Sequence, residues 1–259
     1  MAERVSFPSS TGPMLAGLVD LPQGDAGRIR GWGVFSHGFT LGKDCLAAAR
    51  ICRQLASEGI GMLRFDNLGL GDSEGDWGDG SFTVKVADTV QALRFMTERG
   101  TPARLLVGHS FGGCAVLAAA KQVASVAAVA TIGAPSDPSR TEHQYDAVVD
   151  RVLADGEAQW LAGGKKALTL KRAFVEDVRE ADLHGVIPTL GRPLLVMHSP
   201  TDDTVPIENA GEIFRLAQHP RSFVSLEGSD HLLTVPGHAQ RAARIVSAWA
   251  DPYLPGHHN

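Results

Sequence analysis

The chain has 259 residues, of which 44% are hydrophobic and 20% are charged. This composition is ordinary for a globular protein, and the length allows one large domain or two small ones. The formal net charge of −5 gives no basic surface, which disfavours nucleic acid and anionic membranes as partners. Small neutral or weakly charged ligands fit this charge balance better.

The sequence has no predicted leader or membrane span. No apolar run reaches the roughly 18 residues that cross a bilayer, and Met1–Ser6 lacks a charged region followed by an apolar segment. Of the three cysteines, Cys45 and Cys52 are spaced about 10 Å apart along a predicted helix, too far for a disulfide, and Cys114 is left over. We therefore expect reduced thiols and a cytoplasmic location.

Apolar and β-branched runs alternate with helix-like stretches along most of the chain. This alternation predicts an α/β fold with a mostly parallel central sheet and helices on both faces. We expect an antiparallel pair of strands at Arg4–Pro8 and Met14–Leu21, and further strands at Gly31–Ser36, Gly61–Phe65, Arg104–Val107, Ser125–Ile132, Pro193–His198 and Phe223–Leu226. We expect helices at Asp44–Glu58, Phe82–Arg99, Cys114–Ala120, Ile207–Ala217 and Ala239–Ala250.

One interval, residues 136–191, breaks this alternation. It contains polar stretches that are predicted as helices, Tyr145–Ala158 and Leu170–Val178, joined by Gly163 and Gly164. Ligands of open α/β sheets bind beyond the carboxyl ends of the strands. We therefore interpret the interval as a small lid over that end of a single domain that takes up the whole chain. A plain surface insertion is the alternative.

A serine between two glycines is the first catalytic candidate. The sequence Gly108-His109-Ser110-Phe111-Gly112 follows an apolar strand and precedes a helix. This is the context of a nucleophile elbow, a strained turn that projects the serine hydroxyl above the sheet. The same pattern recurs around Ser73, but there it lies in turn-forming sequence with no helix directly after it. The context therefore selects Ser110.

A serine nucleophile needs a base, and the base needs an acid that orients it. With an elbow of this kind, the expected order along the chain is serine, acid, histidine. Asp202 and Asp203 follow a buried strand, and His231 follows the last strand, so these side chains face the same sheet edge as Ser110. We predict His231 as the base and Asp202 as the acid, with Asp203 as the alternative.

Acyl transfer also requires backbone N–H groups that stabilise an oxyanion. One is predicted at Phe111, where the free N–H groups and the dipole of the following helix favour negative charge. The second is predicted in the loop Ser36–Thr40, with the N–H of Phe39 as the donor and that of Thr40 as the alternative. The sequence predicts no metal site, because no element carries His or Cys at ligand spacing.

Taken together, these motifs resemble the α/β-hydrolase superfamily over nearly the whole chain. The segments Ser36–Asp44, Arg64–Gly75, Gly108–Gly113 and Ile132–Pro138 look like the hydrolase domain of bacterial α/β-hydrolase/OsmC fusion proteins. The resemblance implies an α/β-hydrolase fold, a carboxylesterase that acts on small acyl esters, and the catalytic and oxyanion residues named above. It covers the hydrolase domain alone, so the peroxide-handling activity of the OsmC part is not carried over.

We therefore predict a serine carboxylesterase that forms an acyl-enzyme and uses no cofactor. A hydrolase of the same fold acting on thioester, amide, lactone or C–C bonds is the alternative. A non-catalytic ligand-binding protein is disfavoured, because serine, acid and base are all present. In the lid, Tyr145, Phe174 and His143 are candidates to line a pocket for small groups, since the interval is too short to build a large cover.

Overall fold

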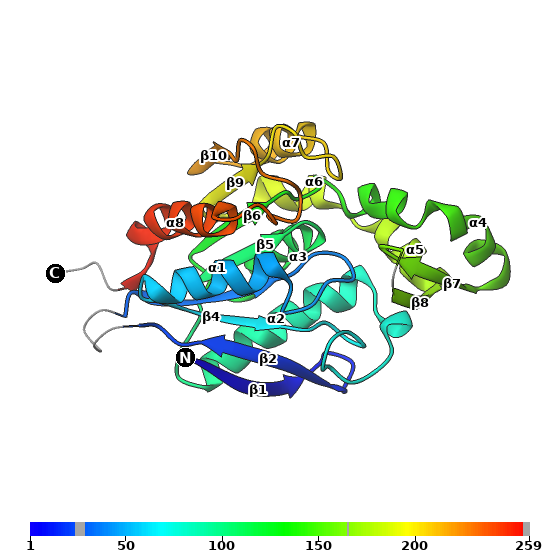
Figure 1. Ribbon diagram of the computed structural model, residues 1–259, viewed down its shortest axis with the longest axis horizontal. Coiled ribbons are helices and arrows are strands. Elements are labelled where there is room, and N and C mark those ends of the chain that lie inside the picture. Colours follow the sequence, from blue (N-terminus) through cyan, green and yellow to red (C-terminus); the bar gives the residue numbers. More distant parts are fainter. Residues whose placement is uncertain (24–28, 165, 256–259) are drawn as a thin grey trace.

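A central sheet organises the computed structural model, which describes residues 1–23, 29–164 and 166–255 (Figure 1). The described residues place eight strands in this sheet, in the order β1-β2-β4-β3-β5-β6-β9-β10. The bounds are β1 Ala2–Pro8, β2 Met14–Asp20, β3 Gly31–Ser36, β4 Ile60–Phe65, β5 Leu105–His109, β6 Ala128–Ile132, β9 Leu194–His198 and β10 Arg221–Ser225. β2 runs antiparallel to β1 and β4, whereas the other neighbouring strands are parallel. The predicted, mostly parallel sheet is confirmed.

Helices cover both faces of this sheet, as predicted (Figure 1). One face carries α1 (Leu46–Ser57) and α8 (His238–Ala250), and the other carries α2 (Phe82–Glu98), α3 (Phe111–Ala119) and α7 (Glu208–Leu216). Short 3₁₀ helices lie at Trp77–Asp79, Ala120–Gln122, Pro138–Gln144, Ile187–Thr189 and Asp251–Tyr253.

The strands divide their side chains between two hydrophobic cores. In β3, Val34 belongs to the core beneath α2, α3 and α7, and the next residue, Phe35, belongs to the core beneath α1 and α8. Successive residues of a strand point to opposite faces, so a strand that is covered on both faces is apolar throughout. This explains the uninterrupted apolar runs Leu105–Val107 and Leu194–Met197, and burial on both sides holds their carboxyl ends in place.

Helix α2 carries two charged residues on its buried face. The helix begins after Ser81, whose hydroxyl accepts a hydrogen bond from the N–H of Val84, a common way to cap a helix. Lys85 and Asp88 lie on the buried face of α2 and are 5% and 0% exposed. Their apolar neighbours on this face are Phe82, Val86, Val90 and Leu93.

The segment between β6 and β9 contains a β-hairpin that the sequence pattern did not predict. The helix expected to reach Ala158 ends at Asp155, because Gly156 takes a left-handed conformation with φ 92°. The second expected helix begins only at Arg172, since the residues before it belong to a strand. The elements are α4 Asp146–Asp155, β7 Glu157–Ala162, β8 Lys166–Lys171, α5 Arg172–Glu180 and α6 Leu183–Val186.

The local sequence explains this hairpin. In β7, Ala158 and Ala162 are buried whereas Glu157, Gln159 and Leu161 are exposed, which is the two-residue period of a strand. β7 pairs antiparallel with β8. The turn between them contains Gly163 and Gly164, both with positive φ, as tight hairpin turns require.

We call residues 136–191 the insertion. Figure 1 shows most of it at one end of the sheet, where α4, α5, β7 and β8 lie apart from the other helices. Phe174 of the insertion packs its ring 5.6 Å from that of Phe39, after β3, and 6.3 Å from that of Phe111, after β5. The insertion therefore packs against the loops at the carboxyl ends of the parallel strands.

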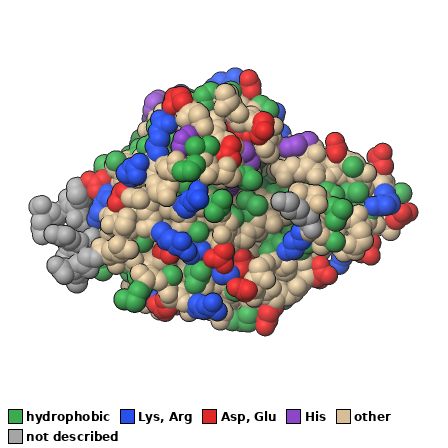
Figure 2. All heavy atoms as spheres, viewed as in Figure 1, with side chains coloured by type: hydrophobic (Ala, Val, Ile, Leu, Met, Phe, Trp, Pro, Cys, Tyr) green, Lys and Arg blue, Asp and Glu red, His purple; other side chains and the backbone are tan. Residues whose placement is uncertain are grey.

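The face shown in Figure 2 carries Lys and Arg side chains interspersed with Asp and Glu. Within the described ranges, no helix is long and apolar enough to cross a membrane. The same residues contain no group of three His, Cys, Asp or Glu side chains placed to hold a metal ion. Cys45, Cys52 and Cys114 are free thiols, as the sequence predicts.

Candidate active site

Ser110 lies at the sharp turn between β5 and α3. Its backbone has φ 54° and ψ −128°, a strained conformation that residues other than glycine rarely adopt. Helix α3 begins at the next residue, Phe111. The turn also needs glycine, because a Cβ at Gly112 would overlap the backbone carbonyl oxygens of Ser36 and His37. This close packing holds the Ser110 side chain at the carboxyl end of β5.

Hydrogen bonds link Ser110, His231 and Asp202 in one chain. Nε2 of His231 lies 3.0 Å from Oγ of Ser110, and Nδ1 of His231 lies 2.8 Å from Oδ2 of Asp202. A carboxylate only accepts, so Nδ1 donates to it and leaves Nε2 to accept from the serine hydroxyl. An imidazole held in this way has the geometry to remove the serine proton.

Asp202 is held by the backbone as well as by His231. Its Oδ1 accepts hydrogen bonds from the N–H groups of Thr204, at 3.0 Å, and Val205, at 2.8 Å. Burial raises the pKa of Asp202, but the bonds from His231 and from these N–H groups outweigh burial and keep the pKa below its usual value. Asp203 is exposed and accepts from the hydroxyl of Thr204. The structure brings Asp202 to His231 and leaves Asp203 in solvent.

Two further buried histidines hold the backbone around this chain. Nε2 of His109 donates to the carbonyl oxygen of His231, and Nε2 of His198 donates to that of Val205, both over 2.8 Å. Burial, followed by the charge of His231, lowers the pKa of His109 to about 4. Burial also lowers the pKa of His198. Both rings are therefore neutral near pH 7.

The loop after β3 lies directly against Ser110. A Cβ at Gly38 would be 3.2 Å from the Cβ of Ser110. The ring of Phe39 meets that of Phe111 edge to face, with centroids 5.5 Å apart. The N–H of Phe111 lies in the first turn of α3, where backbone N–H groups have no acceptor inside the helix. The loop and the helix start thus bring backbone from two elements to the same side of Ser110.

Local contacts fix the conformation of this loop. Nδ1 of His37 donates to the carbonyl of Gly38 over 2.9 Å, and Nε2 accepts from the N–H of Asn67 over 3.3 Å. Burial and the nearby charge of Lys85 lower the pKa of His37 well below its usual value, so the ring stays neutral and keeps both roles. Thr40 has a positive φ of 55°, which reverses the chain.

An ion-pair network holds the end of the loop. Nζ of Lys43 lies 2.9 Å from Oδ2 of Asp66 and 2.6 Å from Oδ2 of Asp72. The N–H of Lys43 donates to Oδ1 of Asp66 over 2.6 Å, and Arg64 donates to the carbonyl of Lys43 over 2.6 Å. Burial lowers the pKa of Lys43, but hydrogen bonds to Asp72, Asp66 and Asp44 outweigh it and raise the pKa above its usual value.

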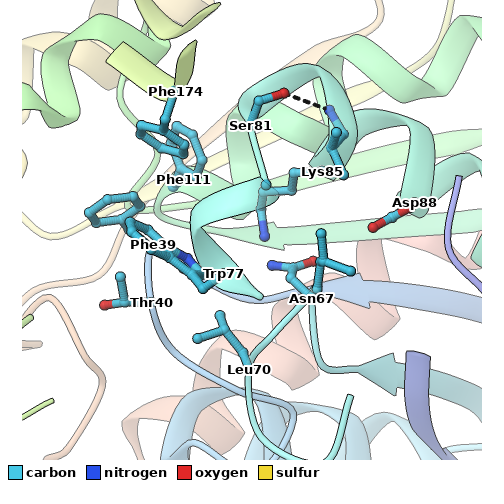
Figure 3. Close-up of a pocket in the computed structure, with 14 residues that line it drawn as sticks. Phe39, Thr40, Asn67, Leu70, Trp77, Ser81, Lys85, Asp88, Phe111 and Phe174 are labelled. Carbon is cyan, nitrogen blue, oxygen red and sulfur yellow. Dashed lines mark hydrogen bonds between the residues drawn. The ribbon is translucent and has the colours of Figure 1, made fainter. Parts of the chain in front are cut away.

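Aromatic residues of the insertion surround Phe39. The ring centroids of Tyr145 and Trp160 each lie 5.7 Å from that of Phe39, and Phe174 lies at 5.6 Å. Trp77, from the segment before α2, completes the group at 5.7 Å. Phe39, Trp77 and Phe174 line a cavity beside the loop after β3 (Figure 3).

The three residues predicted in the lid occupy different positions. Phe174 is buried and lines this cavity. Tyr145 is buried against Phe39. His143 is exposed, and its Nδ1 is hydrogen-bonded to the carbonyl of Arg140 over 2.7 Å. The structure therefore brings Tyr145 and Phe174 to the loop after β3 and leaves His143 on the surface.

Sequence reasoning missed residues that support the site without being part of the hydrogen-bonded chain. Lys43 and Asp66 are 23 residues apart, and no local pattern links them. His109 stands in the sequence only as part of the elbow motif, which does not predict its bond to the carbonyl of His231. Lys85 did leave a signal, because a lysine on the apolar face of a helix is rarely buried without a partner. Ser73, the residue rejected as nucleophile, donates instead to the carbonyl of Asp66 over 2.7 Å.

Residues 34–248 match the Alpha/beta hydrolase family (Abhydrolase_6). The match runs from β3 into α8 and includes Ser110, Asp202 and His231. The chain therefore belongs to the alpha/beta hydrolase family, and the fold predicted from the sequence is confirmed.

Known relatives agree with this assignment. The esterase domain of a Rhodothermus marinus protein is 38% identical, with a TM-score of 0.78 over 98% of this chain and 99% of that one. Est1E from Butyrivibrio proteoclasticus, solved with ferulic acid, is 18% identical, with a TM-score of 0.77 over 96% of this chain and 98% of that one, and shares the fold.

Curated relatives match over a shorter range. The uncharacterized protein YfhR of Salmonella typhi is 22% identical over 181 residues, which are 69% of this chain and 57% of that protein. The match thus spans little more than half the length of this relative.

Proposed function

We propose that the protein is a serine carboxylesterase with Ser110 as nucleophile, His231 as general base and Asp202 as the acid that orients His231. The observation that carries this proposal is the hydrogen-bonded chain from Ser110 Oγ through His231 to Asp202, with links of 3.0 Å and 2.8 Å. The strained backbone of Ser110 supports it, since strain of this kind is concentrated at functional sites.

The reaction proceeds in two halves. His231 takes the hydroxyl proton as Ser110 Oγ bonds to the ester carbonyl carbon. The tetrahedral intermediate then collapses, the C–O bond to the alcohol breaks, and His231 gives its proton to the departing alcohol. Water attacks the acyl-enzyme with His231 again as base, which releases the acid and restores the Ser110 hydroxyl.

The oxyanion formed in each half is stabilised by the backbone N–H groups of Phe111 and Phe39, with Thr40 as the alternative to Phe39. Two observations support these donors: Phe111 is the first residue of α3, and Gly38 lies against Ser110. Preorganised donors of this kind contribute roughly 3–4 kcal/mol each to transition-state stabilisation.

The substrates are small acyl esters, and the insertion acts as the lid that limits their size. The aromatic contacts of Phe39 with Tyr145 and Phe174 support this reading, because they leave little room for a long chain. His143 is the third proposed lid contact, and it lies exposed on the insertion. The esterase domain from Rhodothermus marinus, at 38% identity, also supports an ester substrate.

Three broader predictions stay proposals. They are a cytoplasmic location, supported by the free thiols; a single domain with residues 136–191 as its lid; and membership of the group of hydrolase domains that occur fused to OsmC. The last is supported only by the segments Ser36–Asp44, Arg64–Gly75, Gly108–Gly113 and Ile132–Pro138.

Hydrolysis of short-chain p-nitrophenyl esters and labelling by a fluorophosphonate probe test the assignment. We expect the protein to hydrolyse the acetate and butyrate esters faster than the palmitate ester, and to carry one label on Ser110. Ser110→Ala should lose both activity and label. Ser73→Ala is the matched control, since Ser73 has the same Gly-x-Ser-x-Gly context, and it should keep the label. Undiminished hydrolysis by Ser110→Ala would disprove the mechanism.

A further inference from the structure

A cavity beside the loop after β3 has one aromatic side and one polar side (Figure 3). The free space inside it is about 30 Å³, which is enough for a small polar group such as a hydroxyl or a water molecule. Phe39, Trp77, Phe111 and Phe174 lie on one side, and Asn67, Lys85 and Asp88 lie on the other. A mostly apolar pocket with a few polar groups at one place is typical of a ligand site.

The cavity lies beside the turn that carries the proposed nucleophile. Gly38 lines it, and a Cβ at Gly38 would be 3.2 Å from the Cβ of Ser110. Phe111, the neighbour of Ser110, also lines it. A group bonded to Ser110 could therefore extend into this space.

The acyl group, rather than the alcohol, belongs in this cavity. The departing alcohol must lie beside His231, which gives it a proton. The lining residues come from the loops after β3 and β4, the segment before α2, α2 itself, the start of α3, and α5. None of these described lining residues comes from the loop that carries His231.

Three polar atoms on the polar side have no hydrogen-bond partner among the described residues. They are Nζ of Lys85, Oδ1 of Asn67 and Oδ2 of Asp88. Lys85 is 5% exposed and Asp88 is fully buried. The other carboxylate oxygen of Asp88 is saturated, because it accepts from the N–H and hydroxyl of Ser10 and from the hydroxyl of Ser9. Buried polar atoms without partners are costly, so a bound water or a polar group of a ligand would satisfy them here.

These atoms have the hydrogen-bonding pattern that fits a hydroxyl group. Lys85 is a donor, whereas Oδ1 of Asn67 and Oδ2 of Asp88 are acceptors, and a hydroxyl both accepts and donates. A carboxylate would fit less well, since it would meet the negative charge of Asp88. Burial lowers the pKa of Lys85 to about 7 against the raising effects of Asp88, Cys114 and Cys45, and the amine donates a hydrogen bond in either protonation state.

We propose that this cavity is the acyl subsite and that it selects acyl groups that carry a hydroxyl. The hydroxyl accepts from Nζ of Lys85 and donates to Asn67 or Asp88, while the carbon frame of the acyl group lies against Phe39, Trp77 and Phe111. This inference rests on the proposed esterase function and specifies its substrate class. Lys85 is then a specificity-determining residue.

Paired esters test the proposal. Methyl esters of 3-hydroxybutyrate, 4-hydroxyphenylacetate and 3-(4-hydroxyphenyl)propionate place the hydroxyl at increasing distance from the carbonyl, and each is compared with its deoxy counterpart. We expect kcat/KM to favour the hydroxyl ester by about tenfold or more in at least one pair, because the deoxy ester leaves the polar side unpaired. If kcat/KM of the wild-type protein differed by less than about threefold in every pair, this result alone would overturn the proposal.

The Lys85→Met variant tests whether Lys85 causes the preference for the hydroxyl ester. In this variant, kcat/KM for the preferred hydroxyl ester should fall more than kcat/KM for its deoxy counterpart, so that the ratio of the two falls to about one. Lys121→Met, at an exposed lysine that contacts Thr189, should keep the wild-type ratio. A preference that survives in folded Lys85→Met would also overturn the proposal. Failure of the esterase function itself would appear separately, as no hydrolysis of any deoxy ester and no fluorophosphonate label.

Discussion

The ammonium of Lys43 lies 2.9 Å from the carboxylate of Asp66, and the two side chains are only 6% and 1% exposed. Asp66 also accepts from the N–H of Lys43 and from that of Asp72. This pair ties the loop after β3 to the end of β4. The loop is the one that we propose to supply an oxyanion donor, so its position matters to the reaction.

Asp66→Ala should therefore reduce both stability and activity. Removing one partner of a buried ion pair costs about 3–5 kcal/mol, and the released loop should lower kcat/KM for p-nitrophenyl butyrate. Asp72→Ala is the control, because the side chain of Asp72 is 73% exposed and exposed pairs contribute only about 0–1 kcal/mol. Urea unfolding and initial rates measure the two effects. Equal losses in both variants would contradict the anchoring role of Asp66.

The two adjacent aspartates should differ sharply in their effect on rate. Asp202→Asn replaces the acceptor of His231 Nδ1 with an amide and disturbs the tautomer that lets Nε2 accept from Ser110. We expect kcat to fall by about 10⁴-fold with little change in fold. Asp203→Asn, at the exposed neighbour, should keep a rate close to wild type. A larger fall in kcat for Asp203→Asn than for Asp202→Asn would show that Asp203 is the acid.

Glycine at position 112 should be irreplaceable, in contrast to a glycine in open space. Gly112→Ala pushes a methyl group into the carbonyl oxygens of Ser36 and His37, and such overpacking costs about 1–3 kcal/mol. It also moves the start of α3 and should abolish ester hydrolysis. Gly211→Ala adds the same methyl group at an exposed position of α7, with no atom within 4 Å, and should stabilise by about 0.5–1 kcal/mol. Thermal unfolding gives both values.

Lys85 should make stability depend on pH. Its pKa is about 7 in the folded protein and 10.5 in a free side chain, so between these values the unfolded chain binds more protons. Stability must then rise with pH in this window, by on the order of 1 kcal/mol per pH unit. Below about pH 7 both states are protonated and this contribution is constant. The difference in unfolding free energy between wild type and Lys85→Met at pH 6, 7, 8 and 9 measures it. A flat difference would show that the pKa of Lys85 is not lowered.

The insertion shows where local patterns mislead. The sequence predicts helices at Tyr145–Ala158 and Leu170–Val178 joined by Gly163 and Gly164, whereas Glu157–Ala162 and Lys166–Lys171 form the β7–β8 hairpin. The two-residue alternation of β7 is short, and its buried face is supplied by alanines rather than large apolar residues. Its place in the fold depends on contacts with distant residues, such as Trp160 against Phe39, which no local window contains.

The amino-acid sequence by itself determined the sheet, its helices and the order of Ser110, Asp202 and His231 along the chain. Ser110 and Asp202 follow buried apolar strands and His231 follows the edge strand β10, and the carboxyl ends of parallel strands meet at one sheet edge, so local patterns were sufficient. Only the tertiary structure decided which buried charges find partners. Lys43 meets Asp66 while Lys85 faces a cavity, because pairing across tens of residues depends on packing and register, which periodicity along the chain does not encode.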